Sequence, residues 1–77
     1  MRKGTAMIHI ETNINYMPLP YRLAIERLGN VSGDERTLDR FNGICEEYET
    51  VYALSEMPER FNYREDAWGI AKRRYGL

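Results

Sequence analysis

The amino-acid sequence predicts an α+β domain that is mostly helical, with one N-terminal strand followed by three helices (β-α-α-α). Three observations lead to this prediction. Apolar residues alternate with polar ones over residues 5–16, apolar residues then recur at intervals of three and four, and prolines and glycines separate these segments. At 77 residues the chain is expected to form a single domain over residues 1–77, with residues 1–4 as a flexible N-terminus.

The N-terminal strand is predicted over residues 5–16, where the side chains alternate with period two. Isoleucines on the apolar face favour a strand, since β-branched residues fit a pleated, half-buried surface. Pro18 then ends it. The polar face of this strand would carry Met7, His9, Glu11 and Asn13.

The first helix is predicted over residues 19–28. Pro20 suits the first turn of a helix, where a missing N–H costs nothing, and Gly29 is expected to cap the other end. The apolar positions between them lie on one helical face, and they are Tyr21, Ala24, Ile25 and Leu28.

The second helix is predicted from about residue 33 to about residue 55, ending before Pro58. Ser32 and Glu35 have the spacing of a capping box at its start. Residues 50–54 remain open to an alternative, a short second strand, because their composition is β-branched and aromatic. The apolar stripe of this helix consists of Leu38, Phe41, Cys45, Tyr48 and Tyr52.

The third helix is predicted to begin at Asn62, with Glu65 three positions later as in a second capping box, and to end at Gly76. Its last turn is basic, which suits the negative end of the helix dipole. That turn holds Lys72, Arg73 and Arg74, and the core face would hold Trp68, Ala71 and Tyr75.

A lone strand cannot satisfy its own backbone N–H and C=O groups, so the predicted strand needs a partner. It could pair with residues 50–54, with its twin in a two-fold dimer, or with a sheet edge of another protein. In the last two cases the strand-edge or dimer contacts would come from Ile8, His9, Ile10 and Glu11.

Composition excludes several classes of function. Eleven Lys and Arg residues against 12 Asp and Glu give a net charge of −1, which argues against a general nucleic-acid binder. The single cysteine, Cys45, excludes an internal disulfide and a cysteine-based zinc cage, and its place on the apolar stripe indicates a buried, inert thiol. There is no glycine-rich phosphate loop or nucleophile elbow, so we expect no enzymatic activity, no cofactor and no metal site. No apolar run is long enough to span a membrane, and we expect a cytoplasmic protein.

Two groups of side chains are candidates for partner binding. The first is an acidic helix face, which could dock on a basic partner through complementary charge. The second is a set of aromatic residues, a type that is enriched at interfaces. The acidic group consists of Glu46, Glu47, Glu49 and Glu56, and the aromatic group of Tyr16, Tyr63, Trp68 and Tyr75.

The sequence therefore favours a small protein-binding module without catalysis. We expect an adaptor or inhibitor that docks on a larger intracellular protein complex, for example a phage or mobile-element inhibitor of a host nucleic-acid-binding or defence machinery. The alternative is a dimeric DNA-binding regulator. The order strand, helix, turn, helix resembles that of the ribbon–helix–helix repressors, in which paired strands read the major groove. The DNA contacts would then come from Met7, His9, Asn13, Lys72, Arg73 and Arg74.

Overall fold

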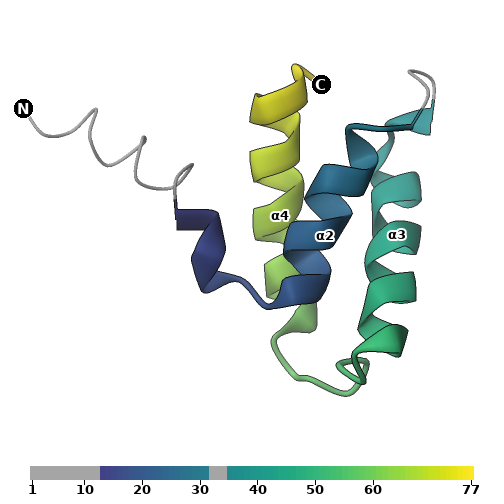
Figure 1. Ribbon diagram of the computed structural model, residues 1–77, viewed down its shortest axis with the longest axis vertical. Helices are drawn as coiled ribbons and strands as arrows, with labels where there is room; N and C mark the ends of the chain where they lie inside the picture. The colour runs from purple at the N-terminus through teal and green to yellow at the C-terminus, as the bar shows by residue number, and fades with distance from the viewer. Residues whose placement is uncertain (1–12, 32–34) are drawn as a thin grey trace, which may run out of the picture.

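The computed structural model describes residues 13–31 and 35–77, which form one short 3-10 helix and three α-helices (Figure 1). These elements are η1 (Asn13–Tyr16), α2 (Leu19–Leu28), α3 (Leu38–Val51) and α4 (Arg60–Tyr75). Within those two ranges there is no β-strand, so the predicted α+β class with its β-α-α-α order is wrong. The described part of the chain is a small all-helical domain.

The predicted N-terminal strand is contradicted where the structure describes it. Residues 13–16 turn as a 3-10 helix, and the N–H of Met17 donates to the carbonyl of Ile14 at 3.0 Å. This turn brings Ile14 and Met17 to the same side, where both pack against the core. The rest of the predicted strand, residues 5–12, lies outside the described residues.

The alternative second strand over residues 50–54 is also wrong, because Thr50 and Val51 complete α3. The chain then reverses in a Schellman motif. The N–H of Leu54 donates to the carbonyl of Glu49 at 2.7 Å, and that of Ala53 to Thr50 at 3.2 Å. Ala53 takes the left-handed conformation (φ 59°) that glycine usually adopts there.

The predicted ends of the second and third helices differ from the observed ones. Thr37 caps α3 by accepting a hydrogen bond from the backbone N–H of Arg40 at 3.2 Å, so α3 begins later than predicted. The predicted cap residue Ser32 lies outside the described residues. At α4, Glu59 occupies the N-cap position without a side-chain hydrogen bond, and the helix begins before Asn62.

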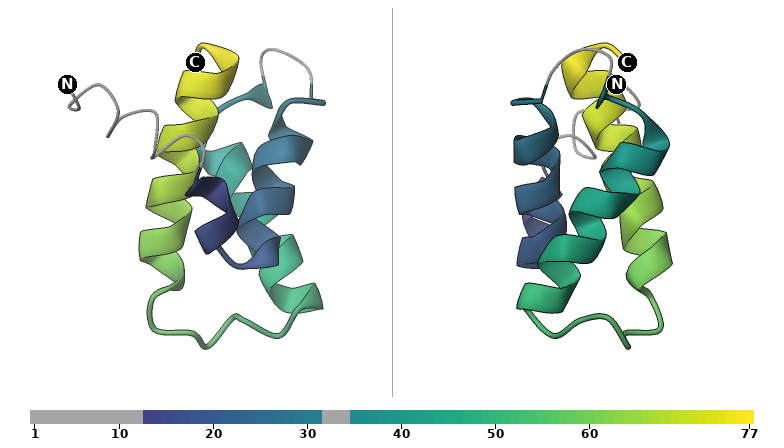
Figure 2. Two further views of the ribbon diagram at one scale, coloured as in Figure 1. Left: turned by 60° about the vertical axis from the view of Figure 1, so that its left-hand side comes forward. Right: turned by 90° about the vertical axis from the view of Figure 1, so that its right-hand side faces the viewer.

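Helix α2 has the predicted bounds, and it is the central element of the core. It packs against both α3 and α4, more extensively than those two helices pack against each other (Figures 1 and 2). Its buried residues are Pro20, Tyr21, Ala24, Ile25 and Leu28. Helix α3 adds Phe41, Ile44 and Cys45 to the core, and α4 adds Ala67, Ile70 and Ala71.

The end of α4 is joined to the end of α2 by a close approach that requires glycine. The hydroxyl of Tyr75 donates to the backbone carbonyl of Ile25 at 2.8 Å, and its ring passes directly over Gly29. A Cβ at Gly29 would lie 2.5 Å from Cζ of Tyr75. Gly29 is the C-cap residue of α2, as its sequence position predicted. The backbone of Gly29 has an ordinary φ of −67°, so it is the Tyr75 ring that excludes a side chain there.

We therefore expect Gly29→Ala to lower the free energy of unfolding by about 1–3 kcal/mol, because the added methyl displaces the Tyr75 ring. Gly43→Ala is the matched control, because a Cβ there has no neighbour within 4 Å. That change should raise the free energy of unfolding by about 1 kcal/mol through helix propensity alone. Urea denaturation followed by circular dichroism measures both. Equal shifts of one sign would contradict the role given to Tyr75.

Candidate functional site

An open groove of about 340 Å³ runs between α3 and α4. Its apolar members are accessible from outside, with Leu38 at 48% and Phe61 at 57% of full exposure, and Trp68 half-buried. Since α2 packs on both helices while α3 and α4 pack less on each other, this side of the domain is left uncovered. The groove is lined by Leu38, Asn42, Phe61, Arg64, Glu65 and Trp68.

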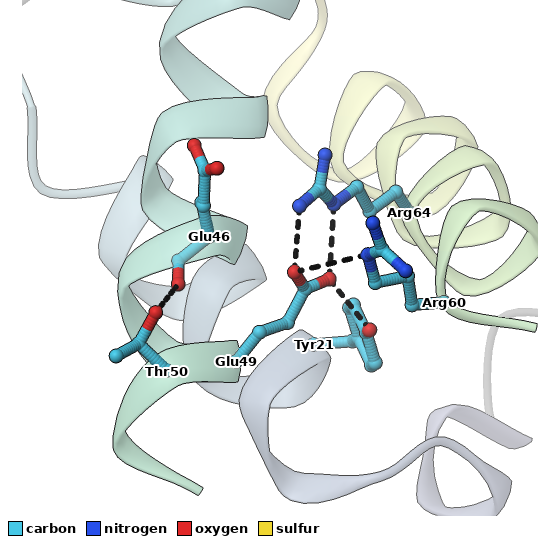
Figure 3. Close-up of polar contacts among 6 residues, drawn as sticks. All are labelled: Tyr21, Glu46, Glu49, Thr50, Arg60 and Arg64. Atoms are coloured by element: carbon cyan, nitrogen blue, oxygen red, sulfur yellow. Dashed lines mark hydrogen bonds and ion pairs between the residues drawn. The ribbon is translucent and has the colours of Figure 1, made fainter. Parts of the chain in front are cut away.

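A buried carboxylate holds the arginine of this groove in place. Glu49 in α3 is 1% exposed, and Arg64 in α4 grips it with two hydrogen bonds, from Nε at 2.9 Å and from Nη2 at 2.6 Å. The hydroxyl of Tyr21 in α2 donates to the same carboxylate at 2.6 Å. One side chain thus joins all three α-helices (Figure 3). Arg60 completes the surroundings, with its Nε 3.9 Å from Oε1 of Glu49.

The electrostatics keep Glu49 ionised. Burial, the largest effect, raises the pKa of this carboxyl, but the hydrogen bonds from Arg64 and Tyr21 and the charges of Arg64 and Arg60 together outweigh it. The pKa of Glu49 is therefore lowered, whereas burial and the bond to Glu49 raise the pKa of Tyr21. The Glu49–Arg64 contact is thus a bidentate ion pair with fixed geometry.

Three cation–aromatic contacts shape the α4 wall of the groove. The guanidinium carbons of Arg60 and Arg64 lie 4.2 and 4.9 Å from the centre of the Phe61 ring. Farther along α4, Nζ of Lys72 lies 5.9 Å from the centre of the Trp68 ring. Trp68 also packs against Phe41 of the core, at 5.5 Å between ring centres. Its indole thus connects the core with the groove.

The structure does not assemble the four predicted glutamates into one surface. Glu49 is buried on Arg64, and Glu47 forms an ion pair with Arg27 of α2. Glu46 and Glu56 are exposed, and the charge of Glu46 contributes to raising the pKa of Arg64, after the larger effects of Glu49. Glu46 itself does not line the groove.

Of the four predicted aromatic residues, Trp68 lines the groove. Tyr63 is half-buried and stacks on Tyr21 at 5.4 Å between ring centres, and Tyr75 is held over Gly29. Tyr16 is exposed, and its hydroxyl donates to Asp66 at 3.2 Å. These four side chains therefore serve different parts of the fold.

The residues predicted for the strand edge and for DNA contact are only partly described. Met7, Ile8, His9, Ile10 and Glu11 lie outside the described residues. Asn13 belongs to the 3-10 helix η1. The basic group of Lys72, Arg73 and Arg74 is exposed in the last turn of α4. The element order that resembled the ribbon–helix–helix repressors is absent from the described residues, which contain no strand.

Sequence reasoning missed Leu38, Phe61 and Arg64 as groove residues. Leu38 was assigned to the core stripe of its helix, but it lies at the first position of α3 and is 48% exposed. A signal for the α4 wall was present, since its lining residues follow the i, i+3, i+4, i+7 pattern of one helical face. They are Phe61, Arg64, Glu65 and Trp68.

The remaining chemistry of the described chain is limited. Cys45 is buried, as its stripe position predicted, and burial raises the pKa of its thiol to about 12, so it is protonated at neutral pH. Within residues 13–31 and 35–77, no group of three or more His, Cys, Asp or Glu side chains is placed to hold a metal ion. No helix in these ranges has the length and apolar character needed to cross a membrane.

Comparison with family models, with curated proteins and with solved structures finds no match to this chain.

We expect Tyr21→Phe to lower the free energy of unfolding by about 1–1.5 kcal/mol at neutral pH, because Glu49 loses a buried donor. The folded-state pKa of Glu49 is lowered, so the stability it contributes is present above its unfolded pKa, about 4.3, and is lost as pH falls through the folded value. The difference between wild type and Tyr21→Phe should therefore shrink on acidification. Chemical denaturation between neutral and acidic pH measures it.

Tyr52→Phe is the control for this change, because Tyr52 is an exposed tyrosine at the end of α3. Its stability should follow that of the wild type at every pH. A loss in Tyr21→Phe that stays constant down to strongly acidic pH would contradict the role given to the Glu49 carboxylate.

Proposed function

We propose that this chain is a protein-binding module without catalysis, an adaptor or inhibitor that takes a helix of a larger protein into the groove between α3 and α4. The observation that carries the proposal is the accessible row of Leu38, Phe61 and Trp68 beside Arg64. Trp and Arg are the residue types that most often dominate binding energy, and apolar anchors in an open cleft favour binding over solvation.

The shape of the groove selects the kind of partner. A groove bounded by two helices suits a third helix, which lays its apolar face between them with anchors at i, i+3 or i+4, and i+7. Charged residues of both signs border it, with Glu65 and Arg64 in its lining and Lys72 over the Trp68 ring. The partner helix is therefore amphipathic and carries acidic and basic residues beside its apolar face.

The groove also has a rigid wall. Because Glu49 uses Nε and Nη2 of Arg64, the guanidinium is held before any partner arrives. Ordering a flexible arginine on binding costs about 0.5–1.5 kcal/mol of free energy. Here Arg64 is ordered when the chain folds, so partner binding does not bear this cost. The buried ion pair thus supports binding indirectly, by positioning a side chain of the groove.

The test is selection of helical peptides from a phage-displayed library against the purified chain. We expect enriched peptides with the i, i+3/i+4, i+7 apolar pattern, and their binding should shift the fluorescence of Trp68, the single tryptophan of the chain. Leu38→Glu should weaken the binding of an enriched peptide at least ~10-fold, since it puts a charge among the apolar anchors.

Val51→Glu is the matched control. Val51 lies in the same helix, is 71% exposed and does not line the groove. It should leave peptide binding within about twofold of wild type, as expected of a residue outside the interface. Failure to enrich any helical peptide, or equal loss in both variants, would overturn the proposal.

A further inference from the structure

The exposed side of α4 has the periodicity of a helix-pairing surface. The side chains concerned alternate at intervals of four, three and four residues, which is typical of a seam between paired helices. They are Phe61, Glu65, Trp68 and Lys72. Phe61, Glu65 and Lys72 are exposed, and Trp68 is half-buried. The first three residues of this seam line the groove, so seam and groove are parts of one surface.

Gly69 follows Trp68 in α4 and, like Gly43 in α3, it has no close contact within the described chain that requires a glycine. A Cβ on Gly69 would meet no heavy atom within 4 Å. Glycine is among the least favourable residues inside a helix, so a position with room for a side chain would ordinarily carry one. A bare stretch of backbone does, however, allow a bulky side chain of another molecule to approach closely.

A single two-fold axis accounts for the seam and the glycine together. If two α4 helices pair antiparallel about a point midway between Trp68 and Gly69, Trp68 lies against the partner's Gly69. The same axis places Glu65 opposite the partner's Lys72. Two-fold symmetry repeats both contacts, which gives two indole-on-backbone contacts and two pairs of opposite charges. At a net charge of −1, long-range repulsion between two copies is small.

We propose that the groove is occupied, in the absence of the larger partner, by α4 of a second copy of this chain paired antiparallel about Trp68 and Gly69. This inference rests on the proposed function, because it concerns the same groove. The partner helix then has to displace a self-complementary helix of similar character, and dissociation of the dimer becomes a step in partner binding. Self-association competes with partner binding, so a partner that binds the groove more weakly than the second copy does not displace it.

The test is a charge exchange, read as molar mass by light scattering after size exclusion from micromolar to millimolar concentration. The wild type should pass from 9.1 kDa to twice that mass. Glu65→Lys and Lys72→Glu should each weaken the dimer at least ~10-fold, because like charges then face each other. The double variant should restore association to within about threefold of wild type, because opposite charges face each other again.

Gly69→Gln and Gly43→Gln form the steric control pair. Both replace a helical glycine that has open space around it with the same helix-favouring side chain, so both should keep the helical circular dichroism spectrum. Only Gly69→Gln should abolish the dimer, because only Gly69 lies at the proposed two-fold axis, opposite the partner's Trp68. A wild type that stays monomeric throughout, or a double charge variant that fails to recover, overturns the proposed pairing.

The outcomes also separate this inference from the proposed function. A monomeric wild type that binds library peptides in the groove leaves the proposed function standing and removes the self-pairing. A dimer that shows the expected charge-exchange behaviour but enriches no peptide supports the self-pairing and removes the proposed function.

Discussion

The buried carboxylate of Glu49 is the constraint on which the rest of this domain depends. It lies in α3, accepts a hydrogen bond from Tyr21 of α2 and two from Arg64 of α4. The two carboxylate oxygens thus fix the three helices relative to one another. An ionised group at 1% exposure is tolerated only when its lone pairs are satisfied, and here at least three hydrogen bonds do so. The same bonds orient Arg64 in the groove wall, which connects the interior to the surface that we propose to bind a helix.

Local signals predicted some parts of the fold well. Helix α2 was predicted with its observed bounds because prolines precede it, Gly29 follows it and its apolar positions occupy one face. The strand prediction failed where it can be checked, because a short alternation ending at Ile14 and Tyr16 fits a 3-10 turn that buries Ile14 and Met17 equally well. The end of α3 was missed because its left-handed residue is Ala53, where the sequence shows no glycine.

The candidate site was less predictable than the helices, for a physical reason. Periodicity tells which side of a helix is apolar, but it does not tell which neighbour covers that side. Leu38 was therefore predicted to lie in the core, although it is exposed and lines the groove. Glu49 was predicted to lie on a solvated acidic face, although it is buried on Arg64. Only the packing of three helices distinguishes these cases. Trp68, which was predicted both for the core face of its helix and as a surface aromatic, packs against Phe41 and also lines the groove. Its part in partner binding stays a prediction.

The contacts that close this domain span most of the chain. Tyr75 bonds to Ile25 and Tyr16 to Asp66, each across 50 positions of sequence. Helices α2 and α3 are synthesised before α4, and without α4 the Glu49 carboxylate lacks the guanidinium of Arg64. Burial of this carboxylate without its partner is unfavourable, so the nascent chain should reach its native packing only once α4 is available. Folding is therefore completed by α4, the helix that also carries most of the groove residues.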